Sequence, residues 1–451
     1  MPTLGRRTLS VASSAALALL TLAGLAAAGG RVTLAAADAS ATSDHAGPAS
    51  ATQPPPPANR STSDGTFVVA VALGASGTVS SDALAPYEVF ASSPRFTVYA
   101  VAATTGPAPT QGGPDIVPTY TFADTATGRA PRPDVVVVPA VNSPDSRQEA
   151  PLRRWVTDQA NDGARILGVC YGSGVLAATG LLDGRTATSH WSRIRQLTKA
   201  HPVHVRVRGQ RFVQDGAITT TAGVTSGIPG ALRVMSDLAG PREAARVGRT
   251  VGYPNWSATA PTDIPIQSFN SGDVPIGLNA VLPWGRPTVG ITLTDGIGEI
   301  DLASSFEVFD VSYAARAVPL SVTGTITTQH GLVVRTNTLT DDPTPTRLAV
   351  PGPGGTIDPA IKEWAAQRHV PIDAVHGTAA GFDGALKYLA SRAGHTTAVS
   401  AGKMIDYPTA HLRLEGPAGT RIPALTACAL ALAGLAAAAP TLMQRSRRLR
   451  R

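Results

Sequence analysis

Residues 166–174 read Ile166-Leu-Gly-Val-Cys-Tyr-Gly-Ser-Gly174. The apolar residues before the cysteine are typical of a buried strand, and the small residues after it favour a helix that begins at once. Gly168 and Gly172 fit this interpretation, because a sharp strand-to-helix turn brings backbones close together and leaves no room for bulky neighbours. The pattern therefore predicts a strand–turn–helix elbow with Cys170 at its tip.

The segments around this elbow alternate between apolar, β-branched runs and helical patterns. We expect four strands, at Thr66–Leu73, Phe96–Ala102, Val135–Val138 and Arg165–Val169, and two helices, at Ser81–Phe90 and Glu149–Asn161. Nearly continuous apolar strands are typical of a parallel sheet that is covered on both faces. The fold class is therefore predicted to be α/β with a mostly parallel sheet.

The chain also repeats itself. The segment Asp82–Phe90 recurs as Asp301–Phe309 at an offset of 219 residues, whereas Tyr253–Pro254 recurs as Tyr407–Pro408 at an offset of 154. We interpret residues 287–410 as a truncated second copy that lacks about 65 residues, and place the deletion at the segment from Arg165 to about Gln214. The second copy is expected to pack against the first, where a homodimer partner would lie. The alternatives are a homodimer of the whole chain and a second copy that is a spacer with a vestigial fold.

The two ends of the chain predict membrane segments. Residues 8–30 carry no charge and follow Arg6 and Arg7, so residues 1–37 are interpreted as a signal peptide or signal anchor. Residues 422–443 are also uncharged and long enough to cross a bilayer, and the arginine-rich tail 444–451 should stay in the cytoplasm. We therefore expect a single-pass protein of the cell membrane, with its folded domains on the extracytoplasmic side.

The remaining divisions follow from composition and charge. Residues 38–65 are rich in Ala, Ser, Thr and Pro and are predicted to be a disordered linker, 66–254 form the first domain, and 255–286 form a second linker. The formal charge of +7 falls to about zero once the terminal arginines are set aside, which argues against a nucleic-acid partner. The sequence has no metal-ligand spacing, phosphate-binding loop or dinucleotide fingerprint, so no metal or cofactor is expected.

Cysteine use singles out one thiol. The chain has two cysteines, and Cys428 falls within the predicted membrane helix, so Cys170 is not expected to form a disulfide. At an elbow, the helix N-terminus should lower the pKa of the thiol. The alternative is that Cys170 is a small buried hydrophobic residue.

The elbow and its surroundings resemble a known family. The segments Gly168–Trp191, Phe212–Gly216 and Thr220–Ile228 are similar to the PfpI family, within the class I glutamine-amidotransferase-like superfamily that also contains the parkinsonism-associated deglycase. The likeness is greatest to the branch with isonitrile hydratase and the amino-terminal domains of AraC-type regulators, and covers residues 66–254 and, more faintly, 287–408. It implies a flavodoxin-like sandwich for the first copy.

The resemblance also implies roles for individual residues. Cys170 stands at the nucleophile's position, Asp82 at that of a carboxylic acid beside the thiol, and the backbone N–H groups of Tyr171 and Val141 at that of an oxyanion hole. His190 borders the same pocket and is the third catalytic candidate, as a base. Asp82 could instead cap its own helix, and His190 could be a packed structural histidine.

Two hypotheses follow for function. The first is a cysteine-dependent hydratase or hydrolase acting on a small electrophilic molecule; the second is a ligand-binding or redox-sensing module that keeps the pocket without turnover. Tyr171 replaces the small hydroxyl residue of isonitrile hydratase and the histidine of the PfpI proteases, and Pro139-Ala-Val141 replaces the usual Gly-Gly. Glu88 and Glu307 are predicted to be surface or structural residues.

Overall fold

The computed structural model describes residues 20–31, 66–202, 205–341, 345–377 and 379–416, and also 423–424, 426–433, 435 and 438. Residues 20–31 form a helix. The predicted linker at 38–65 and the tail at 444–451 lie outside the described residues, as do parts of 1–37 and 422–443. Within the described part of the chain, no helix combines the length and the apolar character that a membrane crossing requires.

The first copy is built around a seven-stranded sheet with the order β11-β12-β8-β7-β1-β3-β6. Every neighbouring pair is parallel except the edge pair, β11 and β12. All four residues of β7 are buried, and since successive residues point to opposite faces, both faces of the sheet are covered as predicted. The strands are β1 (Phe67–Ala72), β3 (Phe96–Ala102), β6 (Tyr120–Thr121), β7 (Val135–Val138), β8 (Arg165–Gly168), β11 (Phe212–Asp215) and β12 (Ile218–Thr221).

Two groups of helices pack on this sheet. One group contains α2, α7 and α8, and the other contains α3, α4 and α5. Their bounds, with those of the short α6 and η2, are α2 (Ser80–Ala91), α3 (Phe122–Ala126), α4 (Ala150–Asn161), α5 (Gly172–Ala178), α6 (Ile194–Ala200), η2 (Val224–Ser226), α7 (Gly227–Ala239) and α8 (Pro241–Thr250). Two short parallel pairs complete this copy: β2 (Thr78–Val79) with β4 (Thr110–Gln111), and β9 (Thr186–Ala187) with β10 (Val205–Arg206).

The second copy has a smaller, fully parallel sheet with the order β14-β13-β17-β18. Its strands are β13 (Thr288–Thr292), β14 (Arg316–Leu320), β17 (Arg347–Val350) and β18 (Ile372–Ala374). Its helices are α10 (Glu299–Ser312), α11 (Pro359–Gln367), α12 (Gly381–Ala393) and α13 (His395–Met404). The chain therefore contains two α/β units of unequal size.

The structure corrects the position of the deletion. Val169 donates its N–H to Val138 O at 2.9 Å at the end of β8, and Val375 does the same to Val350 O at the end of β18. The strand to the elbow is thus present in both copies, and His376 takes the place of Cys170. The offset falls from 206 between those two residues to 154 between the first residues of α7 and α12, so about 52 residues are missing after the elbow. The rest of the predicted 65 is spread over earlier loops.

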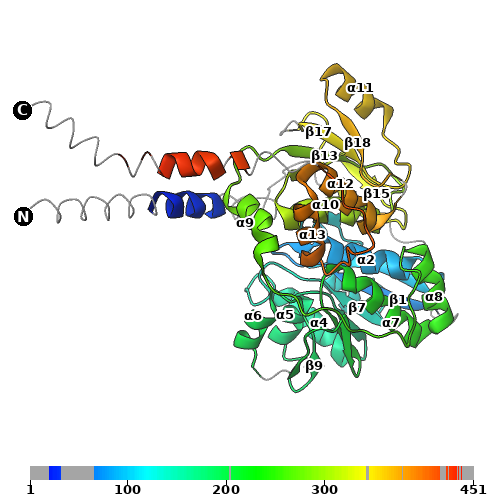
Figure 1. Ribbon diagram of the computed structural model, residues 1–451. Coiled ribbons are helices and arrows are strands. Elements are labelled where there is room, and N and C mark those ends of the chain that lie inside the picture. The colour runs from blue at the N-terminus through cyan, green and yellow to red at the C-terminus, as the bar shows by residue number, and fades with distance from the viewer. Residues whose placement is uncertain are drawn as a thin grey trace, which may run out of the picture.

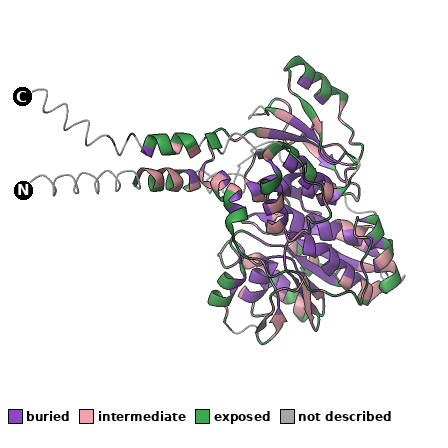
Figure 2. Cartoon of the chain, viewed as in Figure 1, coloured by how far each residue is buried: buried purple, intermediate pink, exposed green. Residues whose placement is uncertain are grey.

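The two copies share one hydrophobic core and one small sheet. Helix α2 packs directly on α10, and buried residues of both copies form a single continuous cluster. Strand β5 (Ile116–Val117) of the first copy pairs with β16 (Val333–Arg335) of the second, which also pairs with β15 (Thr325–Thr327). Figure 1 shows α2 and α10 at the junction, and Figure 2 shows that the junction is buried. The two copies are therefore paired within one chain.

The segment predicted as a linker, 255–286, is more than a spacer. It forms η3 (Ser271–Asp273) and α9 (Val274–Val281), which pack on α13. Earlier in the segment, Ile264 donates its N–H to Gly209 O at 3.0 Å and Arg211 donates to Thr262 O at 2.6 Å. These contacts fix the segment as a wall of the first copy.

Candidate functional site

Cys170 lies at the tip of a strained elbow between β8 and α5. Its φ angle is 56°, a left-handed conformation that side chains other than glycine rarely adopt. A Cβ atom at position 172 would lie 1.9 Å from Val138 O, and one at position 168 would lie 2.7 Å from the Leu176 side chain. Gly172 is therefore needed for the close backbone approach that the sequence predicted, whereas Gly168 makes room for the Leu176 side chain.

The backbone of Cys170 is held from both sides. Its N–H donates to Thr221 Oγ1 at 3.2 Å, and its carbonyl oxygen lies 3.0 Å from Ser173 Oγ and 3.4 Å from Ser189 Oγ. Cys170 is only 7% exposed. The elbow thus presents the thiol inward, in a fixed orientation.

Asp82, in the first turn of α2, faces this thiol. Its side chain is fully buried, Oδ2 accepts the N–H of Ala140 at 3.2 Å, and Oδ1 has no N–H or O–H partner among the described residues. Burial raises the pKa of Asp82 to about 8, against smaller lowering effects of hydrogen bonds from Ala140 and from the Cys170 thiol. The residue at the N-cap of α2 is Val79, so Asp82 does not cap its helix. At neutral pH, Asp82 is a carboxylic acid beside the sulfur.

The thiol itself is not activated by the helix N-terminus. Burial raises the pKa of Cys170 well above its usual value, and the nearby carboxyl groups of Asp82, Glu307 and Asp406 raise it further. A hydrogen bond from the Tyr171 N–H acts in the opposite direction but is smaller. The expectation of a lowered thiol pKa is therefore wrong, because the seven-residue helix α5 cannot offset full burial among acidic groups.

The predicted oxyanion groups lie at the elbow and on the neighbouring loop. The Tyr171 N–H hydrogen-bonds to the sulfur, whereas the Tyr171 ring turns onto Gly174 and lies 5.8 Å from the Arg193 guanidinium carbon. Val141 follows Ala140, the donor to Asp82, on the loop after β7. The Tyr171 ring therefore packs on its own helix.

His190 has a structural environment. Its Nδ1 lies 2.8 Å from Ser192 Oγ and its Nε2 lies 2.7 Å from Met404 O, so Nε2 must donate to that carbonyl. Burial lowers the pKa of His190 to about 4, which keeps the ring neutral. Both ring nitrogens form hydrogen bonds with groups other than the thiol. His190 therefore links the two copies through Met404 and does not act as a base.

The second copy contributes two carboxyl groups that the sequence did not reveal as site residues. Glu307, expected to be a surface or structural residue, is buried and accepts a hydrogen bond from Ser81 Oγ, one residue before Asp82. Asp406 raises the pKa of Cys170 and lines the cavity described below. The recurrence of Glu88 and Glu307 in the repeat was a signal for the first, but no repeat pointed to Asp406.

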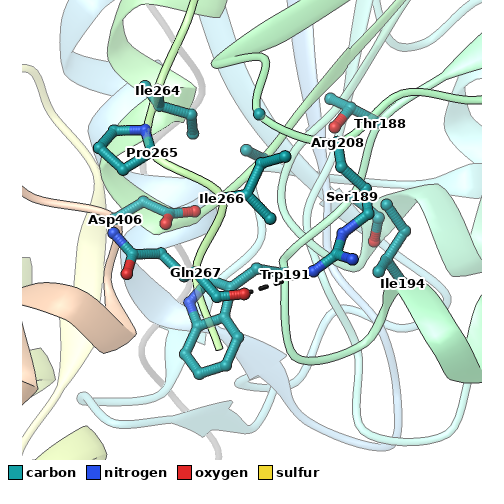
Figure 3. A pocket seen from close by; sticks show the side chains of 12 residues that line it. Thr188, Ser189, Trp191, Ile194, Arg208, Ile264, Pro265, Ile266, Gln267 and Asp406 are labelled. Atoms are coloured by element: carbon teal, nitrogen blue, oxygen red, sulfur yellow. Dashed lines mark hydrogen bonds between the residues drawn. The ribbon is translucent and has the colours of Figure 1, made fainter. Parts of the chain in front are cut away.

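A small cavity lies beside the elbow. Its volume is about 20 Å³, and Cys170 does not line it, but Ser189, Ala222 and Asp406 do. Ser189 contacts the Cys170 carbonyl, and Ala222 follows the threonine that binds the Cys170 N–H. Figure 3 shows its walls, including Trp191 and Arg208. Among the described residues, no group of His, Cys, Asp and Glu is placed to hold a metal ion.

Comparison with known proteins agrees with this geometry. Residues 68–236 match the DJ-1/PfpI family. The chain is 33% identical over 207 residues to isonitrile hydratase from Pseudomonas putida, and the match covers 46% of this chain and 82% of that protein. The chain belongs to the DJ-1/PfpI family. Its matching region contains Cys170, Asp82 and the elbow.

Two further relatives of this DJ-1/PfpI protein are a transcriptional regulator and a solved structure. The transcriptional regulator CdhR from Pseudomonas aeruginosa is 36% identical over 96 residues, which are 21% of this chain and 28% of the regulator. A solved THiJ/PfpI family protein from Pseudomonas syringae is 27% identical, with a TM-score of 0.38, and the match covers 47% of this chain and 87% of that one.

Proposed function

We propose that the first copy is a cysteine-dependent hydratase for small electrophilic molecules, of which an isonitrile is the best-supported example. The observation that carries this proposal is the pairing of the Cys170 thiol with the buried, protonated Asp82. The similarity to an isonitrile hydratase supports the choice of substrate class.

A neutral thiol beside a neutral carboxylic acid suits addition to an isonitrile. The Cys170 sulfur forms a bond to the terminal carbon, Asp82 gives its proton to that carbon, and the thiol proton passes to the other oxygen of Asp82. This step yields a thioimidate and restores Asp82 as an acid. Water then adds to the same carbon, and departure of the thiol leaves an N-substituted formamide.

The proposed oxyanion groups fit the same sequence of steps. The Tyr171 N–H stabilises negative charge that develops on the sulfur, since it already hydrogen-bonds there. We assign the N–H of Val141 to charge that develops on the substrate. Because the thiol is neutral at rest, the reaction does not require a stored thiolate.

The test is conversion of a short alkyl isonitrile to its formamide by the full chain, followed by chromatography. We expect turnover by the unmodified protein and none above background in Cys170→Ala, with Cys428→Ala unchanged. Turnover that survives in Cys170→Ala would overturn the proposal.

The second candidate function is binding of a small ligand without turnover. The high pKa of the thiol favours this candidate over redox sensing, since a redox-sensing cysteine is an accessible, low-pKa thiol. Saturable binding of an isonitrile without formamide production would favour it over the hydratase.

We also propose that the chain is anchored in the cell membrane with its folded domains on the extracytoplasmic side. The support for this location is the uncharged terminal segments and the arginines that flank them. Membrane fractionation and protease accessibility of the full chain in intact cells test this location. Recovery of the chain in the soluble cytoplasmic fraction would contradict it.

A further inference from the structure

Asp406 is a charged residue at a position where the first copy has glycine. At the offset of 154 residues, it corresponds to Gly252. Both positions have a left-handed backbone, with φ of 75° at Gly252 and 55° at Asp406. Glycine adopts this conformation freely, whereas aspartate adopts it at a modest cost in conformational energy. At this left-handed position the second copy carries a carboxyl group, whereas the first copy, which contains Cys170, carries glycine.

The segment that carries Asp406 is clamped onto the first copy. Thr225 Oγ1 donates to Ile405 O at 3.0 Å or Asp406 O at 3.2 Å, and the Thr225 N–H donates to Ile405 O at 3.2 Å. His190 and Trp191 bind the carbonyl groups of Met404 and Lys403. These contacts explain what His190 does: it positions residues 403–406 against the site.

The carboxyl group of Asp406 is largely shielded from solvent, and the residue lines the cavity beside the elbow. Its Oδ2 has no hydrogen-bond partner among the described residues, and it lies 2.3 Å from where a Cβ atom would be at Gly223. In Figure 3 the carboxyl group lies at one wall of the cavity, with Ile266 and Gln267 between it and Arg208. A volume of about 20 Å³ is sufficient for a water molecule but small for an organic substrate.

We propose that Asp406 is the general base for the hydration step, acting on a water molecule held in this cavity. This inference rests on the proposed hydratase function and adds to it a catalytic residue from the second copy. The water oxygen bonds to the thioimidate carbon, and its proton passes to Asp406 and then to the substrate nitrogen. The hydroxyl proton of the resulting adduct leaves with the Cys170 sulfur, so formamide and free thiol are the products.

The electrostatics of the two acids agree with this division of labour. Burial raises the pKa of Asp406 to about 7, and Arg211 moderates the rise, so Asp406 is partly ionised at neutral pH. Asp82, with its pKa near 8, still holds its proton there and cannot accept one from water. Arg208 is a second cation that lines the cavity, and the nearby Cys170 thiol is titratable but neutral in this range.

The test compares Asp406→Asn and Asp406→Gly with the unmodified full chain. Asparagine tolerates the left-handed backbone, and glycine reproduces the first copy at this position and relieves its strain, so both variants should fold. We expect kcat to fall by about 10²- to 10⁴-fold in both, while mass spectrometry shows the isonitrile adduct accumulating on Cys170. The unmodified protein should lose activity as the pH falls below about 7, and this limb should vanish in Asp406→Asn.

The outcomes separate the two proposals. If the adduct forms and is hydrolysed at the same rate in the variants as in the unmodified protein, Asp406 is not the base and the hydratase function stands. If the unmodified protein gives neither adduct nor formamide, the proposed function itself fails, and this inference fails with it.

Discussion

The two elbows of this protein follow equivalent strands but differ in backbone and in chemistry, because the left-handed conformation falls on Cys170 in the first copy and on Gly377, one residue after His376, in the second. In the first copy the buried Asp82 faces the Cys170 thiol; in the second, Asp301 Oδ1 lies 3.6 Å from His376 Nε2, at the position equivalent to the cysteine. His376 is buried, its Nδ1 accepts the N–H of Gly352 at 2.7 Å, and its Nε2 also lies 3.1 Å from Ser304 Oγ. The acid has been kept in both copies, but only the first retains a nucleophile beside it.

The comparison also shows what the second copy still does. Glu88 of the first copy accepts the N–H of Ile300 at the start of α10 at 2.6 Å, and Glu307 of the second copy accepts a hydrogen bond from Ser81 at the start of α2. These residues are related by the same offset of 219, so the contacts are reciprocal. The truncated second copy has no thiol at its elbow, but it still forms one wall of the site that contains Cys170.

The largest expected effect separates the two acids. Asp82→Asn should reduce formamide production by about 10²- to 10⁴-fold, because the amide cannot give a proton to the isonitrile carbon. Asp301→Asn should leave kcat within about threefold, since Asp301 accepts the N–H of Gly381 at 2.6 Å and lies beside His376 in the copy that carries no thiol at its elbow. Equal losses of kcat in the two variants, at equal folded content by circular dichroism, would break the distinction between the copies.

A smaller effect tests the packing of the first elbow. Gly172→Ala would place a Cβ atom 1.9 Å from Val138 O, so we expect the free energy of unfolding to fall by about 1–3 kcal/mol. Gly277→Ala, in α9, is a matched control because a Cβ atom at this position would have no other atom within 4 Å, and it should raise stability by about 0.5–1 kcal/mol. Thermal denaturation of both variants measures the difference, and equal melting temperatures would refute the strained elbow.

The smallest effect concerns the reciprocal glutamates. Burial raises the pKa of Glu88 to about 8 and that of Glu307 well above its usual value. The folded state therefore holds protons that the unfolded state loses above about pH 4.5, so this contribution to stability is greatest below that pH and declines as the pH rises toward 8. Between about pH 4.5 and pH 8, the Tm of Glu88→Gln and that of Glu307→Gln should each fall by on the order of 2 °C less than the Tm of the unmodified protein. The matched variant Glu363→Gln changes an exposed glutamate and should show the same fall in Tm as the unmodified protein. An unchanged slope in both variants would contradict the buried contacts.

Much of the first copy could be predicted from local patterns. The β-branched run of β7 favours an extended strand, and the small residues around Cys170 favour a sharp turn. The strands and the elbow can therefore be predicted from neighbouring residues. The pKa of the thiol could not be predicted in this way, because it depends on Asp82, Glu307 and Asp406, which are distant in the sequence. The structural role of His190 could not be predicted either, because its hydrogen-bond partner, Met404, lies 214 residues away in the sequence.

The position of the deletion is also hidden from the sequence. The repeats are recognisable at Asp82 and at Tyr253, but the elbow of the second copy, Val375-His376, shares too little sequence with Val169-Cys170 to be aligned. Only the matching hydrogen bonds at the ends of β8 and β18 identify the two positions as equivalent.

In the proposed reaction, the chemistry of the first copy begins from a neutral thiol beside a protonated acid. The infrared S–H stretching band of the full chain at pH 7, taken as the difference from Cys170→Ser so that Cys428 cancels, tests it directly. We predict an S–H band for Cys170 at this pH that changes frequency in Asp82→Asn. Absence of the band, with the ultraviolet absorbance of a thiolate in its place, would show that Cys170 is ionised at rest and that the reaction starts from a different state.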